Sequence, residues 1–140
     1  MEYEGVERYG GYVEVDHVGI AVESIEAAEP VLYALGCERR TDTQDEGAFR
    51  YVAYDLGRES GLELLEPTGE DGFVADFLDR YGPGLHHVTF TVDDLDALIG
   101  VLEANGLRIV DYRDEGYRKE AFLSPRNPTG ALFQFWEYVD

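Results

Sequence analysis

An internal repeat constrains the fold of this chain more than any other feature of its sequence. Residues 17–27, HVGIAVESIEA, match residues 87–97, HVTFTVDDLDA, at a shift of 70. The same shift pairs Gly36 with Gly106, so the alignment needs no gap over twenty residues. Self-similarity of this length indicates that two copies of one supersecondary unit make up the chain.

Each copy reads as a β-α-β-β-β unit. Alternating stretches over 13–22 and 86–92 predict the first strands. Ser24 and Asp94 are suited to cap helices of about ten residues, which end where Gly36 and Gly106 can take the left-handed conformation. Three shorter strands follow in each copy, at 38–43, 49–55 and 61–66, then at 107–112, 118–123 and 131–138.

The expected organisation is a single α+β domain made of two modules. A flexible N-terminal segment covers residues 1–12, and the first module covers 13–67. Residues 68–85 form a linker, in which the apolar residues of 71–81 predict a short amphipathic helix. The second module covers 86–140.

Composition excludes several classes of partner. The formal net charge of −19 argues against nucleic acid and anionic membranes, whose phosphates would be repelled. The acidic residues spread along the whole chain, as in salt-adapted, halophile-like proteins, and no calcium loop motif accompanies them. Cys37 is the only cysteine and no apolar run reaches about 18 residues, so we expect a cytoplasmic protein without a membrane span.

His17 and His87 occupy equivalent positions on the first strand of each copy. A single strand histidine is usually structural. Two that are related by a pseudo-twofold axis can converge on one point near that axis, and imidazole is the commonest metal ligand.

The last strand of each copy supplies a second pair. Residues 61–66 align with the last six residues of 131–137 at a shift of 71, which places Glu63 opposite Gln134. Each lies between large apolar neighbours, so strand alternation turns its side chain to the face of the sheet that these neighbours do not occupy. A carboxylate facing the interior would need a cation to offset its desolvation. The alternative is that Glu63 faces solvent.

These residues lie in segments that resemble the vicinal oxygen chelate superfamily, and within it most of all the methylmalonyl-CoA epimerases. The resemblance is carried by 16–22 (DHVGIAV), 62–67 (LELLEP), 77–87 (FLDRYGPGLHH), 122–125 (FLSP) and Gly130. It implies a glyoxalase-like fold, in which two tandem β-α-β-β-β modules form a curved mixed sheet around a central metal cleft. It also implies metal ligands at His17, Glu63, His87 and Gln134, and a homodimer. His86 would point to the opposite face and be structural.

The chain departs from the epimerase pattern at both catalytic bases. In epimerases the ligand on the last strand is typically a glutamate that also acts as base, whereas Gln134 cannot accept a proton at neutral pH. The other base would align with Arg50. Because Glu63 stands where epimerases often have glutamine, our hypothesis is that the site is the pseudo-twofold image of the usual one, with Glu63 as both ligand and base.

Three further residues are candidates for the site. Glu120 is a second acid or base if its side chain faces inward. Arg118 shares its strand parity and aligns with Arg50, so the two arginines would grip a substrate carboxylate. The alternative places all three on a solvated surface.

Two imidazoles, a carboxylate and an amide oxygen suit Co²⁺, Ni²⁺, Zn²⁺ or Mn²⁺. A metal-dependent epimerase or isomerase that removes a proton next to a carbonyl is the expected function, with a small-molecule substrate such as an acyl-CoA. A glyoxalase I-like lactoylglutathione lyase and a non-catalytic ligand-binding member are the alternatives. Gln134 counts against a ring-cleaving dioxygenase, which needs glutamate there.

Overall fold

The computed structural model describes residues 5–44 and 48–139. In these ranges the chain forms eight strands and three helices. They fall into two compact units, one comprising Asp16–His87 and the other the residues before and after it. The α+β class and the β-α-β-β-β order of each copy are confirmed.

The unit Asp16–His87 contains a sheet in the order β2-β3-β4-β1. The β1 and β4 strands are parallel, whereas β4, β3 and β2 are antiparallel neighbours, so the sheet is mixed. Its elements are β1 (Val13–Ala21), α1 (Ile25–Ala34), β2 (Glu38–Gln44), β3 (Phe49–Leu56), β4 (Ser60–Pro67), α2 (Phe73–Tyr81) and the start of β5 (Gly84–Val92).

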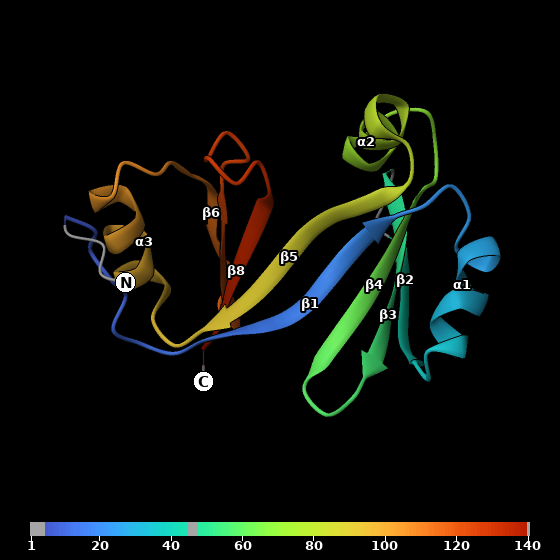
Figure 1. Ribbon diagram of the computed structural model, residues 1–140, viewed down its shortest axis with the longest axis horizontal. Helices are drawn as coiled ribbons and strands as arrows, with labels where there is room; N and C mark the ends of the chain where they lie inside the picture. Colours follow the sequence, from blue (N-terminus) through green and yellow to red (C-terminus); the bar gives the residue numbers. More distant parts are fainter. Residues whose placement is uncertain (1–4, 45–47, 140) are drawn as a thin grey trace. The chain divides into compact units, whose positions relative to one another are not determined.

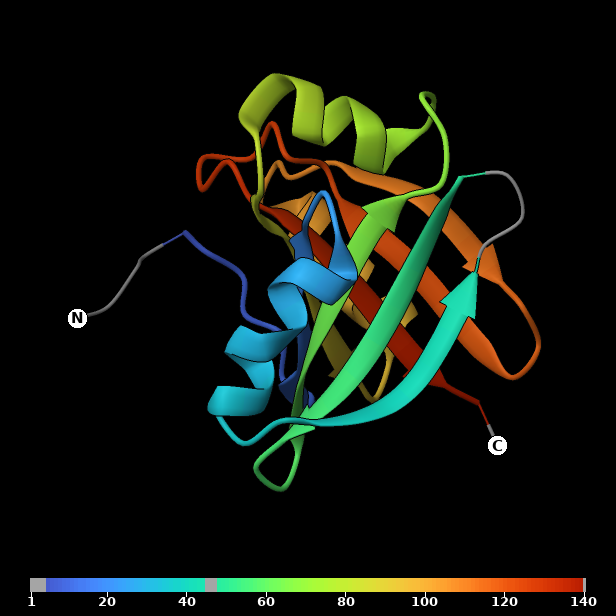
Figure 2. The same cartoon turned by 90° about the vertical axis from the view of Figure 1, so that its right-hand side faces the viewer.

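The core of this unit lies between the sheet and α1, which runs along one face of the strands (Figures 1 and 2). Leu64 is buried in this core and Leu62 packs against it. Strand alternation therefore turns Glu63, which lies between them, to the face away from α1. A second cluster packs α2 against β4 through Val74 and Leu65.

The other unit repeats this plan. Its strands follow the order β5-β8-β7-β6, and α3 covers one face of β6, β7 and β8 (Figure 1). The elements are α3 (Leu95–Ala104), β6 (Ile109–Asp114), β7 (Arg118–Leu123) and β8 (Leu132–Tyr138). Phe133 and Phe135 belong to the core under α3, so Gln134 turns to the opposite face.

The predicted helix ends are confirmed in both copies. Ser24 accepts a hydrogen bond from the backbone N–H of Ala27, and Asp94 accepts one from Ala97. Gly36 and Gly106 have φ angles of 93° and 80°, which residues with a side chain rarely adopt.

The β6 strand begins two residues later than predicted. Leu107 donates its backbone N–H to the carbonyl of Leu102 and so takes part in the turn that closes the C-terminus of α3. Further along β6, Asp111 has a positive φ of 55° where the register with β7 shifts between Val110 and Arg113. The strand thus contains a bulge that the sequence pattern did not predict.

Residues before β1 contact α3 and its N-terminus. Glu7 and Asn105 exchange two hydrogen bonds of 2.9 Å, and the hydroxyl of Tyr9 accepts the backbone N–H of Asp94. Tyr9 also packs against the core under α3. These contacts involve part of the segment 1–12 that we expected to be flexible; residues 1–4 lie outside the described ranges.

A carboxylate from the last strand of each copy binds the helix of the same copy. Glu66 accepts the backbone N–H of Ile25 at 2.8 Å, and Glu137 accepts that of Leu95 at 2.6 Å. Both amides belong to a first helical turn, which has no partner within the helix and carries the positive end of the helix dipole. The repeat therefore conserves a helix-anchoring contact.

The same glutamates identify the counterpart of Arg50. The strand register pairs Arg50 with Glu66, and it pairs Lys119, rather than Arg118, with Glu137. Lys119 also binds Asp96 at 3.3 Å, as Arg50 binds Glu26 at 2.9 Å. The alignment of Arg118 with Arg50 is therefore wrong by one residue. The reason is that β7 carries no repeat motif that would fix the residue offset between the two copies.

Among the residues that the structure describes, no helix is long and apolar enough to cross a membrane.

Removing the anchoring carboxylate should loosen the start of α3. We expect Glu137→Ala to lower the free energy of unfolding by about 1 kcal/mol, the usual cost of losing a helix-capping hydrogen bond. Urea denaturation measures this. Glu103→Ala, at an exposed position of the same helix, is the control and should change stability by less than about 0.5 kcal/mol. Equal stability of the two variants would contradict the anchoring role.

Candidate metal centre

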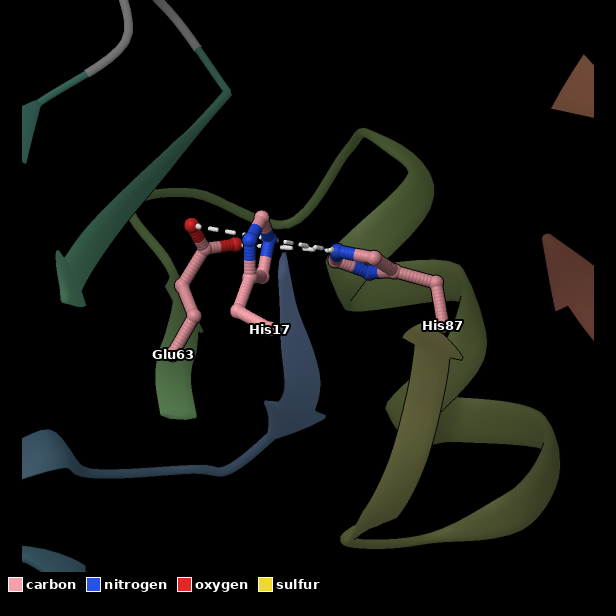
Figure 3. A group of neighbouring side chains, drawn as sticks. All are labelled: His17, Glu63 and His87. Carbon is pink, nitrogen blue, oxygen red and sulfur yellow. Dashed lines mark hydrogen bonds and ion pairs between the residues drawn. The ribbon is translucent and has the colours of Figure 1, made fainter. Parts of the chain in front are cut away.

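Three side chains of the unit Asp16–His87 converge on one point. His17 from β1, Glu63 from β4 and His87 from β5 point toward one another (Figure 3). The two Nε2 atoms are 3.4 Å apart, and they lie 3.6 and 3.8 Å from the Glu63 carboxylate oxygens. Among the described residues, these three form the one group of histidine, cysteine, aspartate or glutamate side chains that could hold a metal ion together.

The register of β1 against β4 brings these residues together. The parallel pairing sets His17 opposite Gly61 and Gly19 opposite Glu63. A Cβ atom on Gly19 would lie 2.2 Å from Cε1 of His87. Gly19 therefore provides the space that the His87 imidazole fills, beside Glu63 in the sheet.

All three side chains are largely removed from solvent. His17, His87 and Glu63 are 6%, 8% and 12% exposed. Burial lowers the pKa of His87 to about 3, with a smaller effect of the neighbouring histidines, so its imidazole is neutral near pH 7. Burial raises the pKa of Glu63, and the nearby His17 partly offsets this rise. The pocket is thus a poor environment for an unpaired carboxylate.

Each histidine has its Nδ1 atom bound by the residue that precedes it. Asp16 contacts Nδ1 of His17 at 2.8 Å, and Nδ1 of His86 lies 2.9 Å from Nδ1 of His87. The Nε2 atoms consequently face Glu63 and each other. A ligand histidine held at its second nitrogen by a neighbour is the usual arrangement in metal sites.

His86 contacts Nδ1 of His87, whereas we expected its side chain to point to the opposite face. Strand alternation fixes the direction of the Cα–Cβ bond. The position of the imidazole also depends on rotation about the Cα–Cβ and Cβ–Cγ bonds. The His86 ring contacts Phe73 and Phe77 of α2, with centroid distances of 5.3 and 5.1 Å. Burial also lowers the pKa of His86.

The donor set fits a divalent ion. Nitrogen ligands lie about 2.1 Å from zinc, so ligand atoms around one ion are about 3.0 to 3.5 Å apart. The Nε2 atoms already have this spacing, and small movements of the Glu63 carboxylate would bring it to the same range. Two neutral imidazoles and one carboxylate suit a borderline metal, whose charge would also compensate the buried Glu63.

Gln134 and Glu120 belong to the other unit, where they contact each other. Thr89 donates its hydroxyl to Oε1 of Gln134 at 2.6 Å, and the Gln134 amide donates to Oε1 of Glu120. Trp136 donates its ring N–H to the same oxygen at 3.1 Å. All but Trp136 are buried. Glu120 thus points into the protein, as an acid or base would need, rather than onto a solvated surface.

Arg50 and Arg118 have different surroundings. Arg50 binds the carboxylates of Asp42, Glu26 and Glu66, which hold its pKa above the ordinary value. These ion pairs tie it to β2, α1 and β4. Arg118 lies over the Trp136 ring, 4.2 Å from its centroid, and its buried Nε atom has no hydrogen-bond partner among the described residues.

Sequence reasoning missed Gly19 and Asp16. Gly19 lies two residues after His17, so strand alternation already places both on one face. A glycine inside a strand often marks the close approach of another group, which was the available signal. Asp16 directly precedes His17, but contact between adjacent strand residues is outside what alternation predicts.

The chain matches one family model and is similar to several known proteins. Residues 16–122 match the family model described as the glyoxalase/bleomycin resistance protein/dioxygenase superfamily. The uncharacterized protein YqjC of Bacillus subtilis is 33% identical over 128 residues, which cover 88% of this chain and 91% of YqjC. The ethylmalonyl-CoA/methylmalonyl-CoA epimerase of Cereibacter sphaeroides is 30% identical over 128 residues, covering 86% of this chain and 94% of the epimerase.

A solved structure has the same fold. The crystal structure of methylmalonyl-CoA epimerase from Mycobacterium tuberculosis superimposes with a TM-score of 0.78 at 27% identity. The match covers 100% of this chain and 94% of the epimerase. The predicted glyoxalase-like fold is thereby confirmed.

The space at Gly19 should be needed for metal binding. In Gly19→Ala the new methyl group displaces the His87 ring, and we expect the dissociation constant for Co²⁺ or Zn²⁺ to rise at least about 10-fold. Isothermal titration calorimetry measures this dissociation constant. Gly100→Ala is the control, since a Cβ there meets nothing within 4 Å, and its affinity should stay unchanged. Wild-type affinity in Gly19→Ala would contradict the role of Gly19.

The burial of neutral His87 should give the metal-free protein a specific sensitivity to acid. Because the folded-state pKa, about 3, lies below the ordinary value of 6.5, this group contributes stability above pH 6.5 that is lost as the pH falls toward 3. One such proton changes the free energy of unfolding by at most about 1.4 kcal/mol per pH unit.

The matched variant is His87→Gln, which cannot take up a proton. Between pH 6.5 and 3 the metal-free wild type should lose more stability than His87→Gln, as measured by urea denaturation at a series of pH values. Parallel pH profiles would count against a neutral, buried His87.

Proposed function

Because the chain belongs to the glyoxalase/bleomycin resistance protein/dioxygenase superfamily, we propose that it is a metal-dependent epimerase or isomerase. Its proposed substrate is an acyl-CoA with an acidic C–H bond next to the thioester carbonyl. The named activity of the Cereibacter sphaeroides relative, on ethylmalonyl-CoA and methylmalonyl-CoA, supports this substrate class.

The observation that carries the proposal is the convergence of His17, Glu63 and His87 in a buried cluster. We assign the three as metal ligands, with Co²⁺, Ni²⁺, Zn²⁺ or Mn²⁺ as the candidate ions. Gln134 stays a prediction as the fourth ligand. A divalent ion at this site would act as a Lewis acid that stabilises negative charge on a substrate oxygen.

Glu63 is our candidate for the catalytic base. Its carboxylate lies within the cluster itself, where it could take a proton from a carbon next to a metal-bound carbonyl. The Nε2 atoms of His17 and His87 flank the Glu63 carboxylate, while their Nδ1 atoms contact Asp16 and His86. Glu63 would take the α-proton onto a carboxylate oxygen. Return of that proton to the other face of the same carbon is epimerisation, and its return to the neighbouring carbon is isomerisation.

We assign Glu120 as the second acid or base. Gln134 and Trp136 both donate to its Oε1, which leaves Oε2 for proton transfer. Arg118 remains our candidate for a substrate-binding residue, whereas the three carboxylates around Arg50 occupy the guanidinium that would otherwise bind substrate. We also retain the homodimer and the cytoplasmic location as predictions.

A glyoxalase I-like lyase is the second candidate. Within the three-residue cluster Glu63 is the sole carboxylate, and a single base suffices to move a proton between neighbouring carbons. The substrate would then be a glutathione hemithioacetal in place of an acyl-CoA.

The decisive experiment follows exchange of the substrate α-proton in D₂O. We expect metal-loaded wild type to exchange the α-proton of methylmalonyl-CoA, and Glu63→Gln to exchange it about 10² to 10⁴ times more slowly, the usual contribution of a general base. Glu63→Ala should lose both bound metal and exchange. Removal of metal from wild type with a chelator should abolish exchange.

Glu59→Gln is the control, because Glu59 lies on the surface in the same part of the chain. It should keep both metal and rate. Absence of exchange with all four candidate metals would refute the acyl-CoA epimerase, and turnover of the methylglyoxal-glutathione adduct would then support the lyase. Stoichiometric metal without either activity would favour a ligand-binding protein.

A further inference from the structure

The repeat places a hydrogen-bonding partner directly before each of the two histidines that converge with Glu63. Asp16 and His86 occupy equivalent positions at the shift of 70. Each contacts the Nδ1 atom of the histidine that follows it, at 2.8 and 2.9 Å. The two partners differ in chemistry, since Asp16 offers a carboxylate oxygen and His86 a ring nitrogen. A ring nitrogen is either donor or acceptor, depending on where its proton lies.

Only one distribution of protons between His86 and His87 is compatible with a metal ligand at His87. The Nε2 atom of His87 faces His17 and Glu63, so this nitrogen must be without a proton to bind a cation. In a neutral imidazole the proton then lies on Nδ1. The His87 Nδ1–H donates to Nδ1 of His86, which must carry its own proton on Nε2.

We propose that His86 is a positioning residue, which acts as a neutral hydrogen-bond acceptor and holds His87 in the tautomer that binds metal. The inference rests on the proposed metal site and adds a residue outside the ligand set. Phe73 and Phe77 of α2 contact the His86 ring, at centroid distances of 5.3 and 5.1 Å. These contacts restrict rotation of the ring, so α2 supports the orientation of a ligand that it does not itself supply.

The matched pair of variants is His86→Asn and His86→Leu. The two new side chains have the same number of heavy atoms and nearly the same shape, so the loss of the imidazole affects packing against Phe73 and Phe77 similarly. Asparagine can place its Oδ1 acceptor near the former Nδ1 position, whereas leucine has no acceptor. The difference between the variants therefore isolates the hydrogen bond from the packing.

The first measurement is metal affinity, by isothermal titration with Zn²⁺ and by the visible absorption of the Co²⁺ form. We expect His86→Leu to raise the dissociation constant about 10- to 100-fold, the usual effect of losing a residue that orients a ligand histidine. His86→Asn should stay within about 3-fold of wild type on the same scale. Equal affinities of wild type and His86→Leu, or equal losses in both variants, would overturn the proposal.

The second measurement needs no variant. Two-bond ¹H–¹⁵N correlation spectra of the metal-free wild type distinguish imidazoles protonated on Nδ1 from those protonated on Nε2. We expect His87 to be protonated on Nδ1 and His86 on Nε2, and the reverse assignment would overturn the proposal. Failure of the wild type to bind any divalent metal would instead refute the proposed function, so the two failures are distinguishable.

Discussion

The buried carboxylate of Glu63, beside the imidazoles of His17 and His87, is the feature on which the candidate site depends. A carboxylate in this environment loses most of its hydration, which the raised pKa of Glu63 expresses. The Nε2 atoms of His17 and His87 lie 3.6 and 3.8 Å from its oxygens, which is longer than a normal hydrogen bond. A cation among the three side chains would remove this electrostatic cost, which is the physical basis of the proposed function.

The arrangement also shows how a duplicated unit can produce unequal halves. Both copies retain the capped helix and the glutamate of the last strand that binds its N-terminus. On the opposite face the copies have diverged. One copy places Gly19 where the other places Thr89, which hydrogen-bonds Gln134. Helix anchoring is therefore the same in both copies, whereas the chemistry of the sheet face away from the helix differs between them.

Much of the fold was predictable because it follows from the alternation of side chains along strands, from the 70-residue repeat and from a few rules for helix ends. Strand alternation placed Glu63 and Gln134 away from the apolar cores, and glycine conformations marked both helix ends. The shift of 70 identified His17 and His87 as a pair. The cluster of His17, Glu63 and His87 could be expected from sequence because its residues lie on regular strands.

The remaining features depend on details that alternation and alignment do not contain. His86 contacts His87 through side-chain torsions, which strand parity leaves free. The misplacement of Arg118 arose because β7 has no repeat motif that fixes its alignment with β3, and the strand pairing of Lys119 with Glu137 reveals it. The environment of Arg50 depends on three carboxylates from three different elements, whose meeting is a tertiary property.

The separation of the ligands along the chain has a thermodynamic consequence. His17 and His87 are 70 residues apart, and Glu63 lies between them. An ion bound by all three would tie together distant points of the chain and act as a cross-link in the folded state. Because the site exists only in the folded chain, metal binding would stabilise the folded state by mass action, in a protein whose single cysteine, Cys37, cannot form a disulfide within the chain. The same ion would then contribute to both reactivity and resistance to unfolding, and the heavily acidic chain would gain a positive charge in its interior.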